Sequence, residues 1–318
     1  MNIHEYQAKQ LLARYGLAVP DGGVATTPDD AEAVAIRVGG EFWAVKAQVH
    51  AGARGQAGGV KLAHSSQEVA KLATSMLGSY LVTTQTAPKG SRVNHVYIER
   101  GCKIDRELFL SVVVDPRTAS VTALASRKGG ADVEQVAAAL PEAIVRKVLP
   151  ARPGVPVHAA TELAAHLGLA GEQVGAFQTV LDGVQRAFVE LDATLIEVNP
   201  LALTTEGELV CLDIKMAFDD NALFRHPDIE QLRDERDELD FLERERFGFN
   251  YVQLNGDVGC LVTGAGLALA TIDLVKVHGG EPANFLDLPP VATRLHVAAA
   301  FRQILANSNV KAILINAV

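Results

Sequence analysis

The sequence predicts a protein of the α/β class whose two parts are organised differently. In the first part, short apolar strands are separated by turns, as in "ELFLSVVVDPRTASVTALAS", which is typical of antiparallel pairs. In the last part, strands alternate with helices of crossover length, which is typical of a parallel sheet with right-handed connections. The length of 318 residues and the hydrophobic fraction of 48% give each part enough material for its own core.

The helices of the first part are predicted from their caps and glycines. "MNIHEYQAKQLLARYGL" has an amphipathic helical pattern that ends at Gly16. Thr27 is placed to cap a second helix that stops at Gly39, and a third helix runs from Ser65 to Gly78. The strands expected here are a short one after the first helix, "EFWAVKAQVH", "VNHVYIER", and the pair joined by a turn at 116–119.

Residues 133–191 are predicted to be mostly helical, with a proline-rich break at 150–157. A hairpin follows, in which "ATLIEVNPLALT" and "ELVCLDIKMAF" are joined by a turn at Glu206 and Gly207. The stretch "HPDIEQLRDERDELDFLERERFGFN" alternates charge signs and indicates a solvated helix or linker. We therefore expect one domain over 1–237 and a second over 238–318.

The second domain is expected to contain three parallel strands and two helices. The strands are "VGCLVTGAG", "PANFLDL" and "VKAILINAV", and the helices between them are "LALATIDLVKVHGG" and "LHVAAAFRQILANS". Since the sequence stops on the third strand, at Val318, we expect the sheet to be truncated or completed by a partner.

Composition and charge exclude several classes of function. The net charge of -9 and the pI near 5.5 argue against a nucleic-acid-binding protein. The three cysteines form no CxxC pair and fit a reducing cytoplasm. No export signal is expected, because charged residues occupy the N-terminal helix. No membrane span is expected either, because Asp273 and Lys276 interrupt the apolar window 258–277.

The segment "KAQVHAGARGQAGGVKLA" predicts an anion-binding loop. Its glycines free the backbone to present N–H groups to an anion, and Lys46 and Arg54 supply positive charge. This arrangement suits a nucleotide phosphate, although GxxxxGK[ST] is absent. The alternative is a flexible surface hairpin with incidental basic residues.

The hairpin carries a second candidate site, rich in oxygen ligands. Glu197 and Asn199 project from one face of their strand, and Asp213 and Lys215 share a face of the other. If the two strands pair, Glu197, Asn199 and Asp213 converge, and their oxygens suit magnesium that also binds substrate phosphates. The alternative is an exposed polar face.

Other polar residues carry weaker signals. Glu99 follows a strand, Glu107 opens one, and Cys102 is typical of a small, partly buried apolar residue. "TGAGLAL" lacks the third glycine of a dinucleotide fingerprint, so NAD is not expected, although a helix N-terminus could hold another anion. None of the nine histidines lies in a metal-binding motif, and each is expected to be an ordinary core or surface residue.

Five segments together resemble the β subunits of succinate–CoA ligase and the related malate–CoA ligase. They are "MNIHEYQAKQLLARYGL", "VKAQVHAGARGQAGGVKL", "LIEVNPL", "LDIKMAFDDNALFRHPDI" and "GAGLALATIDLVKVHGGEPANFLD", and they follow the family's order over nearly the whole chain. The resemblance implies an ATP-grasp domain followed by a partial flavodoxin-like domain.

The resemblance also implies roles for particular residues. The residues that match the family's nucleotide-binding positions are Lys46, Ala53, Arg54, Gly55, Glu99, Cys102 and Glu107. Asn199 and Asp213 match its Mg²⁺ ligands, and Glu197 matches a catalytic carboxylate that meets a phosphorylated histidine of the partner α subunit. That subunit also binds CoA. The nucleotide is ATP or GTP, and the acid is a small dicarboxylate such as succinate or malate.

The implied reaction passes from ATP to phosphohistidine, to an acyl phosphate and to the thioester. Such chemistry requires positioning and charge neutralisation more than a nucleophile on this chain.

Three departures from the family lie on the substrate side. "DLPPVAT" replaces "DVGGGAT", so prolines remove N–H donors; Thr263 replaces an asparagine that touches the carboxylate substrate; and the chain ends at "LINAV", before the family's next glycine loop.

These departures leave two alternatives open. One is a diverged ATP-grasp ligase that passes an acyl phosphate to an amine or another acceptor. The other is a catalytically silent subunit that keeps the nucleotide fold. The principal hypothesis is the acid–thiol ligase β subunit.

Overall fold

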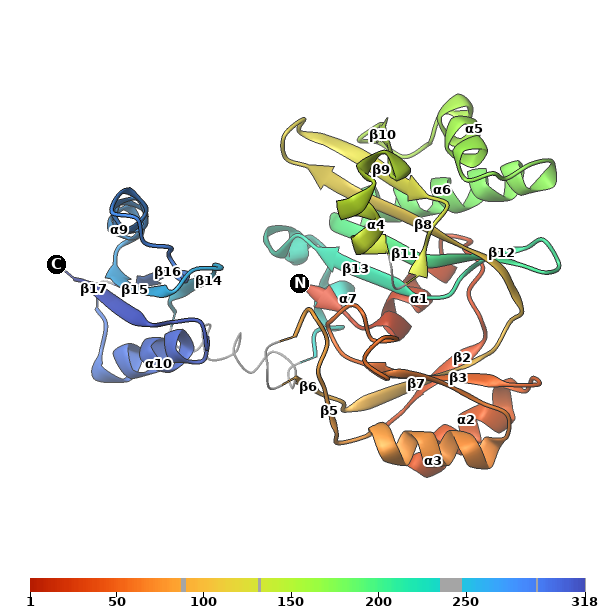
Figure 1. Ribbon diagram of the computed structural model, residues 1–318, viewed down its shortest axis with the longest axis horizontal. Helices are drawn as coiled ribbons and strands as arrows, with labels where there is room; N and C mark the ends of the chain where they lie inside the picture. Colours follow the sequence, from red (N-terminus) through yellow and green to blue (C-terminus); the bar gives the residue numbers. More distant parts are fainter. Residues whose placement is uncertain (87–89, 131–132, 235–247, 290, 318) are drawn as a thin grey trace. The chain divides into compact units, whose positions relative to one another are not determined.

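The computed structural model describes residues 1–86, 90–130, 133–234, 248–289 and 291–317. They form two compact units, Met1–Arg233 and Asp234–Val318, drawn in Figure 1. The expected boundary between residues 237 and 238 lies outside the described residues. No helix in the described ranges is both long and apolar enough to span a bilayer.

The larger sheet of the first unit is antiparallel, in the order β1-β13-β11-β8-β9-β10, with β12 paired to β11. Its strands are β1 (Asn2–Ile3), β8 (Ile104–Asp115), β9 (Ser120–Ser126), β10 (Val145–Leu149), β11 (Ala193–Thr204), β12 (Leu209–Cys211) and β13 (Ile214–Phe218). The helices packed on these strands are α1 (Glu5–Ala13), α5 (Val157–His166) and α6 (Glu172–Glu190). In α6, Phe177, Leu181, Val184 and Phe188 recur at helical spacing and are buried against the sheet.

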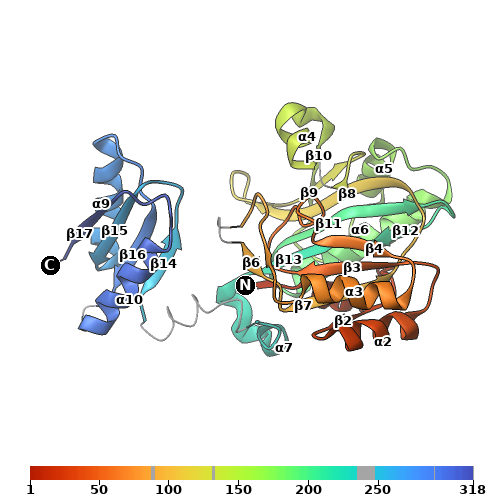
Figure 2. The same ribbon diagram turned by 60° about the horizontal axis from the view of Figure 1, so that its bottom comes forward.

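The smaller sheet is also antiparallel, in the order β2-β7-β3-β4. Its strands are β2 (Gly22–Ala25), β3 (Trp43–Gln48), β4 (Val60–Ala63) and β7 (His95–Arg100), and α2 (Pro28–Val38) and α3 (Ser66–Met76) pack on it (Figures 1 and 2). The expected cap is confirmed, because Thr27 accepts a hydrogen bond from the N–H of Asp30 at 3.1 Å. Ser65 caps α3 in the same way, accepting from the Glu68 N–H at 3.2 Å. A two-stranded ribbon, β5 (Tyr80–Leu81) and β6 (Ser91–Arg92), completes the strands described in this unit.

One segment expected to be helical is a strand. Residues 133–191 are mostly helical, as predicted, but Val145–Leu149 pairs with β9 from Val145↔Ala125 to Leu149↔Val121. Five residues are too few for a stable helix, whereas an open sheet edge offers backbone partners. The helical elements around it and after the hairpin are α4 (Val133–Ala139), η2 (Pro141–Ala143), η3 (Asp220–Arg225) and α7 (Pro227–Glu230).

The predicted hairpin is confirmed, with one difference. From Leu195 onward, strand β11 pairs with β13 and β12 in one register, through Val198↔Ile214 and Leu201↔Cys211. The second strand, expected to be continuous, is interrupted between those two partners. Pro200 has no N–H to donate across the ladder to Leu212, so the Leu212 carbonyl is left for another donor.

The second unit has a four-stranded sheet in the order β14-β16-β15-β17. Its elements are β14 (Asn250–Gln253), β15 (Val258–Thr263), α9 (Ala265–Val277), β16 (Asn284–Leu288), α10 (Arg294–Leu305) and β17 (Ala312–Asn316). The three predicted strands are parallel, as expected, and β14 adds an antiparallel edge that the prediction did not include. Residues alternate along β15, since Leu261 packs in the cluster with α10 and Val262 in the cluster with α9.

Candidate functional site

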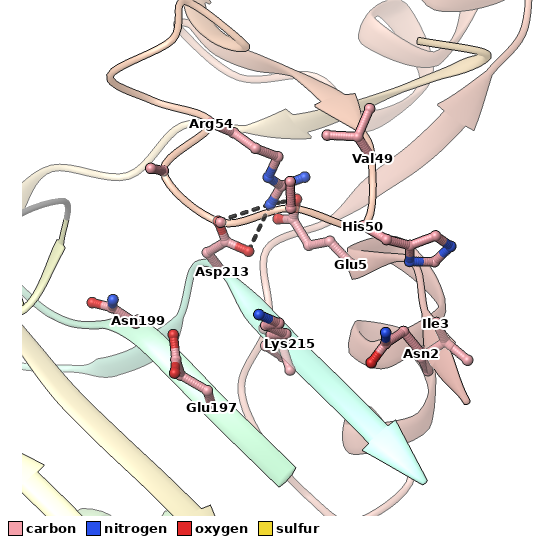
Figure 3. A pocket seen from close by; sticks show the side chains of 14 residues that line it. Asn2, Ile3, Glu5, Val49, His50, Arg54, Glu197, Asn199, Asp213 and Lys215 are labelled. Atoms are coloured by element: carbon pink, nitrogen blue, oxygen red, sulfur yellow. Dashed lines mark hydrogen bonds and ion pairs between the residues drawn. The ribbon is translucent and has the colours of Figure 1, made fainter. Parts of the chain in front are cut away.

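A pocket of about 100 Å³ lies where the glycine-rich loop faces strands β11 and β13. Its lining includes Ala53 and Arg54 from the loop, Glu197 and Asn199 from β11, and Asp213 from the interruption before β13. The register aligns Glu197 with Lys215 and places Asn199 opposite Asp213, so the predicted convergence of these side chains is confirmed. Figure 3 shows the two strands presenting them to the same space.

Arg54 crosses this pocket and pairs with Asp213. Its Nη2 lies 2.7 Å from Oδ1 and 2.8 Å from Oδ2 of that carboxylate (Figure 3). Nη1 donates to the Ala47 carbonyl at 2.8 Å, which anchors the guanidinium to the strand before the loop. A small-molecule site is typically about 300–1,000 Å³, so this side chain must move, or the loop must open, to admit a nucleotide.

Beneath the loop lies a buried network of charges. Lys46 Nζ contacts Glu5 Oε1 at 3.0 Å, forms an ion pair with Glu99, and donates to the Leu212 carbonyl at 2.6 Å. Lys9 pairs with Glu5 at 2.9 Å and also with Glu99. Lys46 therefore takes the acceptor that Pro200 leaves unused, and it links the smaller sheet to the hairpin.

The network fixes the charge state of its members. Burial alone would raise the pKa of Glu5, but the positive charges of Lys46, Lys9 and Arg54 outweigh it and hold that pKa well below its ordinary value. Burial opposes the charged form of Lys9, yet Glu5 and Glu99 raise the Lys9 pKa. Glu5 and Lys9 therefore remain ionised at neutral pH.

Asn199 is held by the loop after β9. Its Oδ1 accepts a hydrogen bond from the Gly130 N–H at 2.6 Å, and its Nδ2 donates to the Gly130 carbonyl at 3.2 Å. Gly130 has a φ of +78°, in the region that favours glycine, and Glu107 Oε2 lies close to its backbone. The exposed Glu107, on β8, therefore lies beside Gly130.

Some backbone N–H groups of the loop donate hydrogen bonds within the protein, and others do not. Gly52 donates to the Gln85 side chain at 2.7 Å, and Gly59 donates to the Arg54 carbonyl at 2.8 Å. Within the described ranges, the N–H groups of Ala53, Arg54 and Gly55 donate to no residue. Ala53 has a φ of +58°, in the left-handed region. These three N–H groups at the tip of the loop are therefore available to bind an anion.

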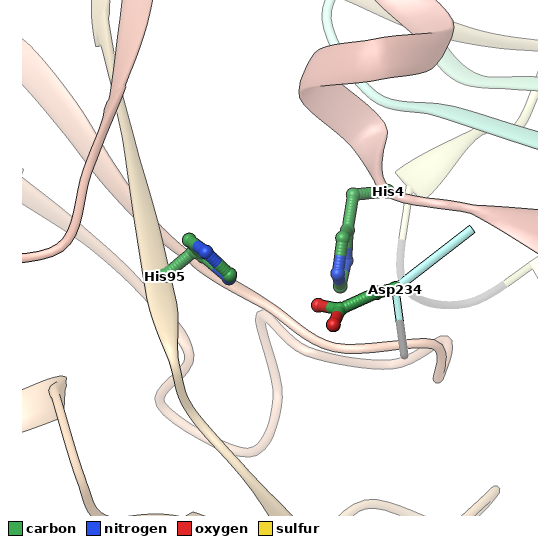
Figure 4. Close-up of side chains that lie close together, drawn as sticks. All are labelled: His4, His95 and Asp234. Atoms are coloured by element: carbon green, nitrogen blue, oxygen red, sulfur yellow. The ribbon is translucent and has the colours of Figure 1, made fainter. Parts of the chain in front are cut away.

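Three histidines lie beside the loop. His4 stacks on His50, with ring centroids 4.3 Å apart and an interplanar angle of 13°. The His4 ring centroid is 5.8 Å from that of His95, at an interplanar angle of 56°, and Figure 4 shows these two rings. Asp234, also drawn in Figure 4, is the first residue of the second unit. The stack packs the loop against the start of α1.

Other predicted residues lie outside the pocket lining. Glu99 is only 3% exposed, within the network, and Cys102 is half-buried. Burial, followed by the charge of Glu99, raises the pKa of the Cys102 thiol, so it is a poor nucleophile. Thr263 ends β15 in the second unit, where the next N–H, of Gly264, donates to Asp287 at 2.8 Å.

The turn that departs from the family's pattern is only partly described. Leu288 is the buried last residue of β16, and Pro289 follows it. Pro290 lies outside the described residues.

Sequence reasoning missed Glu5 and Lys9. Both lie on the buried face of α1, with Ala8 and Leu12 as apolar neighbours. A signal was available, because two charges at i and i+4 on the apolar face of an amphipathic helix are unusual unless they are paired.

Comparison with known proteins gives two family models. An ATP-grasp domain matches residues 2–203, and a CoA-ligase domain matches residues 261–318. The chain is similar to the succinate–CoA ligase (ADP-forming) subunit beta of Paramagnetospirillum magneticum, at 49% identity over 99% of this chain and 82% of that protein. The protein of the same name from Wolinella succinogenes is also 49% identical, over 99% of this chain and 81% of its own length.

Solved structures share the fold. ATP citrate lyase from Methanothrix soehngenii superposes with a TM-score of 0.62 at 18% identity, covering 100% of this chain and 80% of that one. A dinucleotide-forming acetyl-coenzyme A synthetase from Ca. Korarchaeum cryptofilum has a TM-score of 0.52 at 18% identity, over 69% of this chain and 93% of that one. The predicted α/β class with an ATP-grasp domain is thereby confirmed.

Proposed function

Because this chain belongs to the family of succinate–CoA ligase β subunits, we propose that it binds Mg-ATP in the pocket between the loop and the hairpin and passes phosphate to a partner α subunit. The product is an acyl-CoA made from a small dicarboxylate and CoA, in the cytoplasm. The relatives do not favour an amine acceptor or a silent subunit.

This proposal rests on one observation: positively charged and N–H donor groups lie across one pocket from oxygen ligands. On one side lie the Arg54 guanidinium and the N–H groups at 53–55, which suit phosphate oxygens. On the other side lie Asn199 and Asp213, which offer oxygen ligands. Phosphate and a divalent cation are the pair that such an arrangement suits.

The residues fit magnesium by their chemistry. Asp213 is 32% exposed and faces the pocket, and Asn199 Oδ1 retains a lone pair beyond the one used by Gly130. Asn199 and Asp213 would hold the ion, which when bound neutralises phosphate charge during transfer.

The chain's own residues then bind and orient. Arg54 carries two N–H bonds on Nη2, one directed to Glu5 and the other shared by the two oxygens of Asp213. Exchange of Asp213 for a phosphate oxygen frees that carboxylate for magnesium. Glu197, on the same face as Asn199, is proposed to meet the phosphorylated histidine of the α subunit.

The nucleotide is also expected to involve Lys46, Glu99, Cys102 and Glu107, which lie on or beside β3, β7 and β8. Lys46 and Glu99 act from within the network, and their contribution is the placement of charge near the phosphates. Thr263, in the second unit, is proposed to contact the carboxylate substrate through its hydroxyl.

The test is ADP formation from Mg-ATP, with and without a cognate α subunit, CoA and each of a panel of dicarboxylates. Turnover that requires all three additions supports the proposal. Glu197→Gln should retain Mg-ATP binding and lose turnover, whereas Glu206→Gln, an exposed turn residue, should retain both. Bound ATP with no turnover under any combination refutes the ligase function for this chain.

A further inference from the structure

The side chain of Glu5 is at the centre of the buried network. Its Oε1 lies 2.9 Å from Lys9 Nζ and 3.0 Å from Lys46 Nζ. Its Oε2 accepts from Arg54 Nη2 at 2.7 Å and from Gln48 Nε2 at 3.2 Å. Both oxygens are thus fully used, and the side chain is only 2% exposed.

Glu5 is the carboxylate that touches all three cations of the network. Glu99 pairs with Lys9 and Lys46, and Asp213 pairs with Arg54. Three positive and three negative groups therefore balance, but among the described contacts Glu5 alone connects the two halves. Loss of its charge leaves a net positive charge in a buried place.

Glu5 also connects a rigid element to an irregular one. It lies in the first turn of α1, which packs against β13 and α6. Arg54 belongs to a loop with four glycines between β3 and β4, which fixes its own backbone less firmly. The carboxylate therefore defines the place of Arg54 relative to the hairpin.

We infer that Glu5 is a positioning residue of the nucleotide site, which acts through Lys46 and Arg54. The inference rests on the proposed function. When Arg54 exchanges Asp213 for a phosphate oxygen, its second Nη2 hydrogen remains on Glu5, so the guanidinium is directed without losing its anchor. Lys46, on the strand β3 that leads into the loop, donates to the same carboxylate.

The experiment compares Glu5→Gln with the double variant Glu5→Gln/Lys9→Met in the full chain. The single variant leaves the network with a net positive charge and is expected to lower the melting temperature. The double variant restores neutrality, since Lys46 and Arg54 then face Glu99 and Asp213. It is expected to regain most of the melting temperature while binding Mg-ATP about ten- to a hundredfold more weakly than wild type.

Glu172→Gln is the matched control, because it removes another first-turn carboxylate, an exposed one on α6. It should leave Mg-ATP affinity unchanged. Glu5→Asp, which keeps the charge but withdraws it by one carbon–carbon bond, should weaken binding with a small loss of melting temperature. With the α subunit present, the KM for ATP should rise more than kcat falls.

The outcomes separate the inference from the proposed function. A wild-type chain that does not bind Mg-ATP refutes the proposed function. Wild-type affinity in a folded Glu5→Gln/Lys9→Met chain overturns the positioning role and leaves the proposed function intact. If the double variant does not fold, wild-type affinity in Glu5→Asp overturns the role in the same way.

Discussion

Replacing Asp213 by Asn tests the carboxylate that pairs with Arg54 and that we propose as a magnesium ligand. Arg54 is not orphaned by the change, because Glu5 Oε2 at 2.7 Å and the Ala47 carbonyl at 2.8 Å remain. Asp213 is 32% exposed, so solvent already weakens the pair. The expected loss of stability is therefore about 1 kcal/mol, closer to a surface pair than to the 3–5 kcal/mol of a broken buried pair.

The expected effect on ligand binding is larger. For a unit of this size, 1 kcal/mol corresponds to a shift of roughly 2–4 °C in melting temperature. Mg-ATP at a hundred times its Kd should stabilise wild type by about 2.7 kcal/mol, and a tenfold weaker site should gain only about 1.4 kcal/mol at the same concentration. Thermal unfolding with and without Mg-ATP measures both quantities.

The control for Asp213→Asn is Asp21→Asn. Asp21 also pairs with an arginine, Arg100, at 2.9 Å, but both side chains are at least half exposed. This variant should change neither stability by more than about 0.5 kcal/mol nor the Mg-ATP shift. The reasoning is refuted if Asp213→Asn keeps the full Mg-ATP shift, or if it loses 3 kcal/mol or more without ligand.

Three further predictions concern the loop, the network and the cysteines. Ala53→Val places a branched side chain at a φ of +58° and should lower stability by about 1–2 kcal/mol in thermal unfolding, whereas Ala53→Gly should not. Folding lowers the pKa of Glu5, so the ionised carboxylate contributes its full stabilisation above its unfolded pKa of about 4.3 and loses it as pH falls. The difference in melting temperature between wild type and Glu5→Gln should therefore shrink from about pH 6 to pH 3. A constant difference would contradict this. Burial raises the pKa of Cys211 to about 12, so iodoacetamide at pH 8 should modify the half-buried Cys102 first and Cys211 only on unfolding, as mass spectrometry of the peptides will report.

The parts of the fold that follow from local patterns could be predicted. Caps at Thr27 and Ser65, and the pairing that aligns Asn199 with Asp213, depend on residues close in sequence or on a simple alternation. Edge strands β10 and β14 could not, because their strand conformation comes from distant partners rather than from their own composition.

The candidate site divides in the same way. The loop and the hairpin carry visible signals in glycines and spaced polar residues, whereas the network depends on contacts between segments far apart in sequence. Glu5 meets Lys46 and Arg54 across 41 and 49 residues. The charge of Arg54 was predicted to bind phosphate, but its pairing with Asp213 in the free protein was not, since that pair forms across 159 residues.

The interruption between β12 and β13 has a consequence for how variation at this site is interpreted. The acceptor that Lys46 uses there is the main-chain carbonyl of Leu212, so any residue at 212 can supply it and aligned sequences would show only a tolerant position. The constraint falls instead on Pro200, because proline has no backbone N–H to donate to the Leu212 carbonyl. An amino acid with an N–H at that place would compete for the same oxygen. A change at this half-buried position of β11 would therefore affect the lysine beneath the glycine-rich loop.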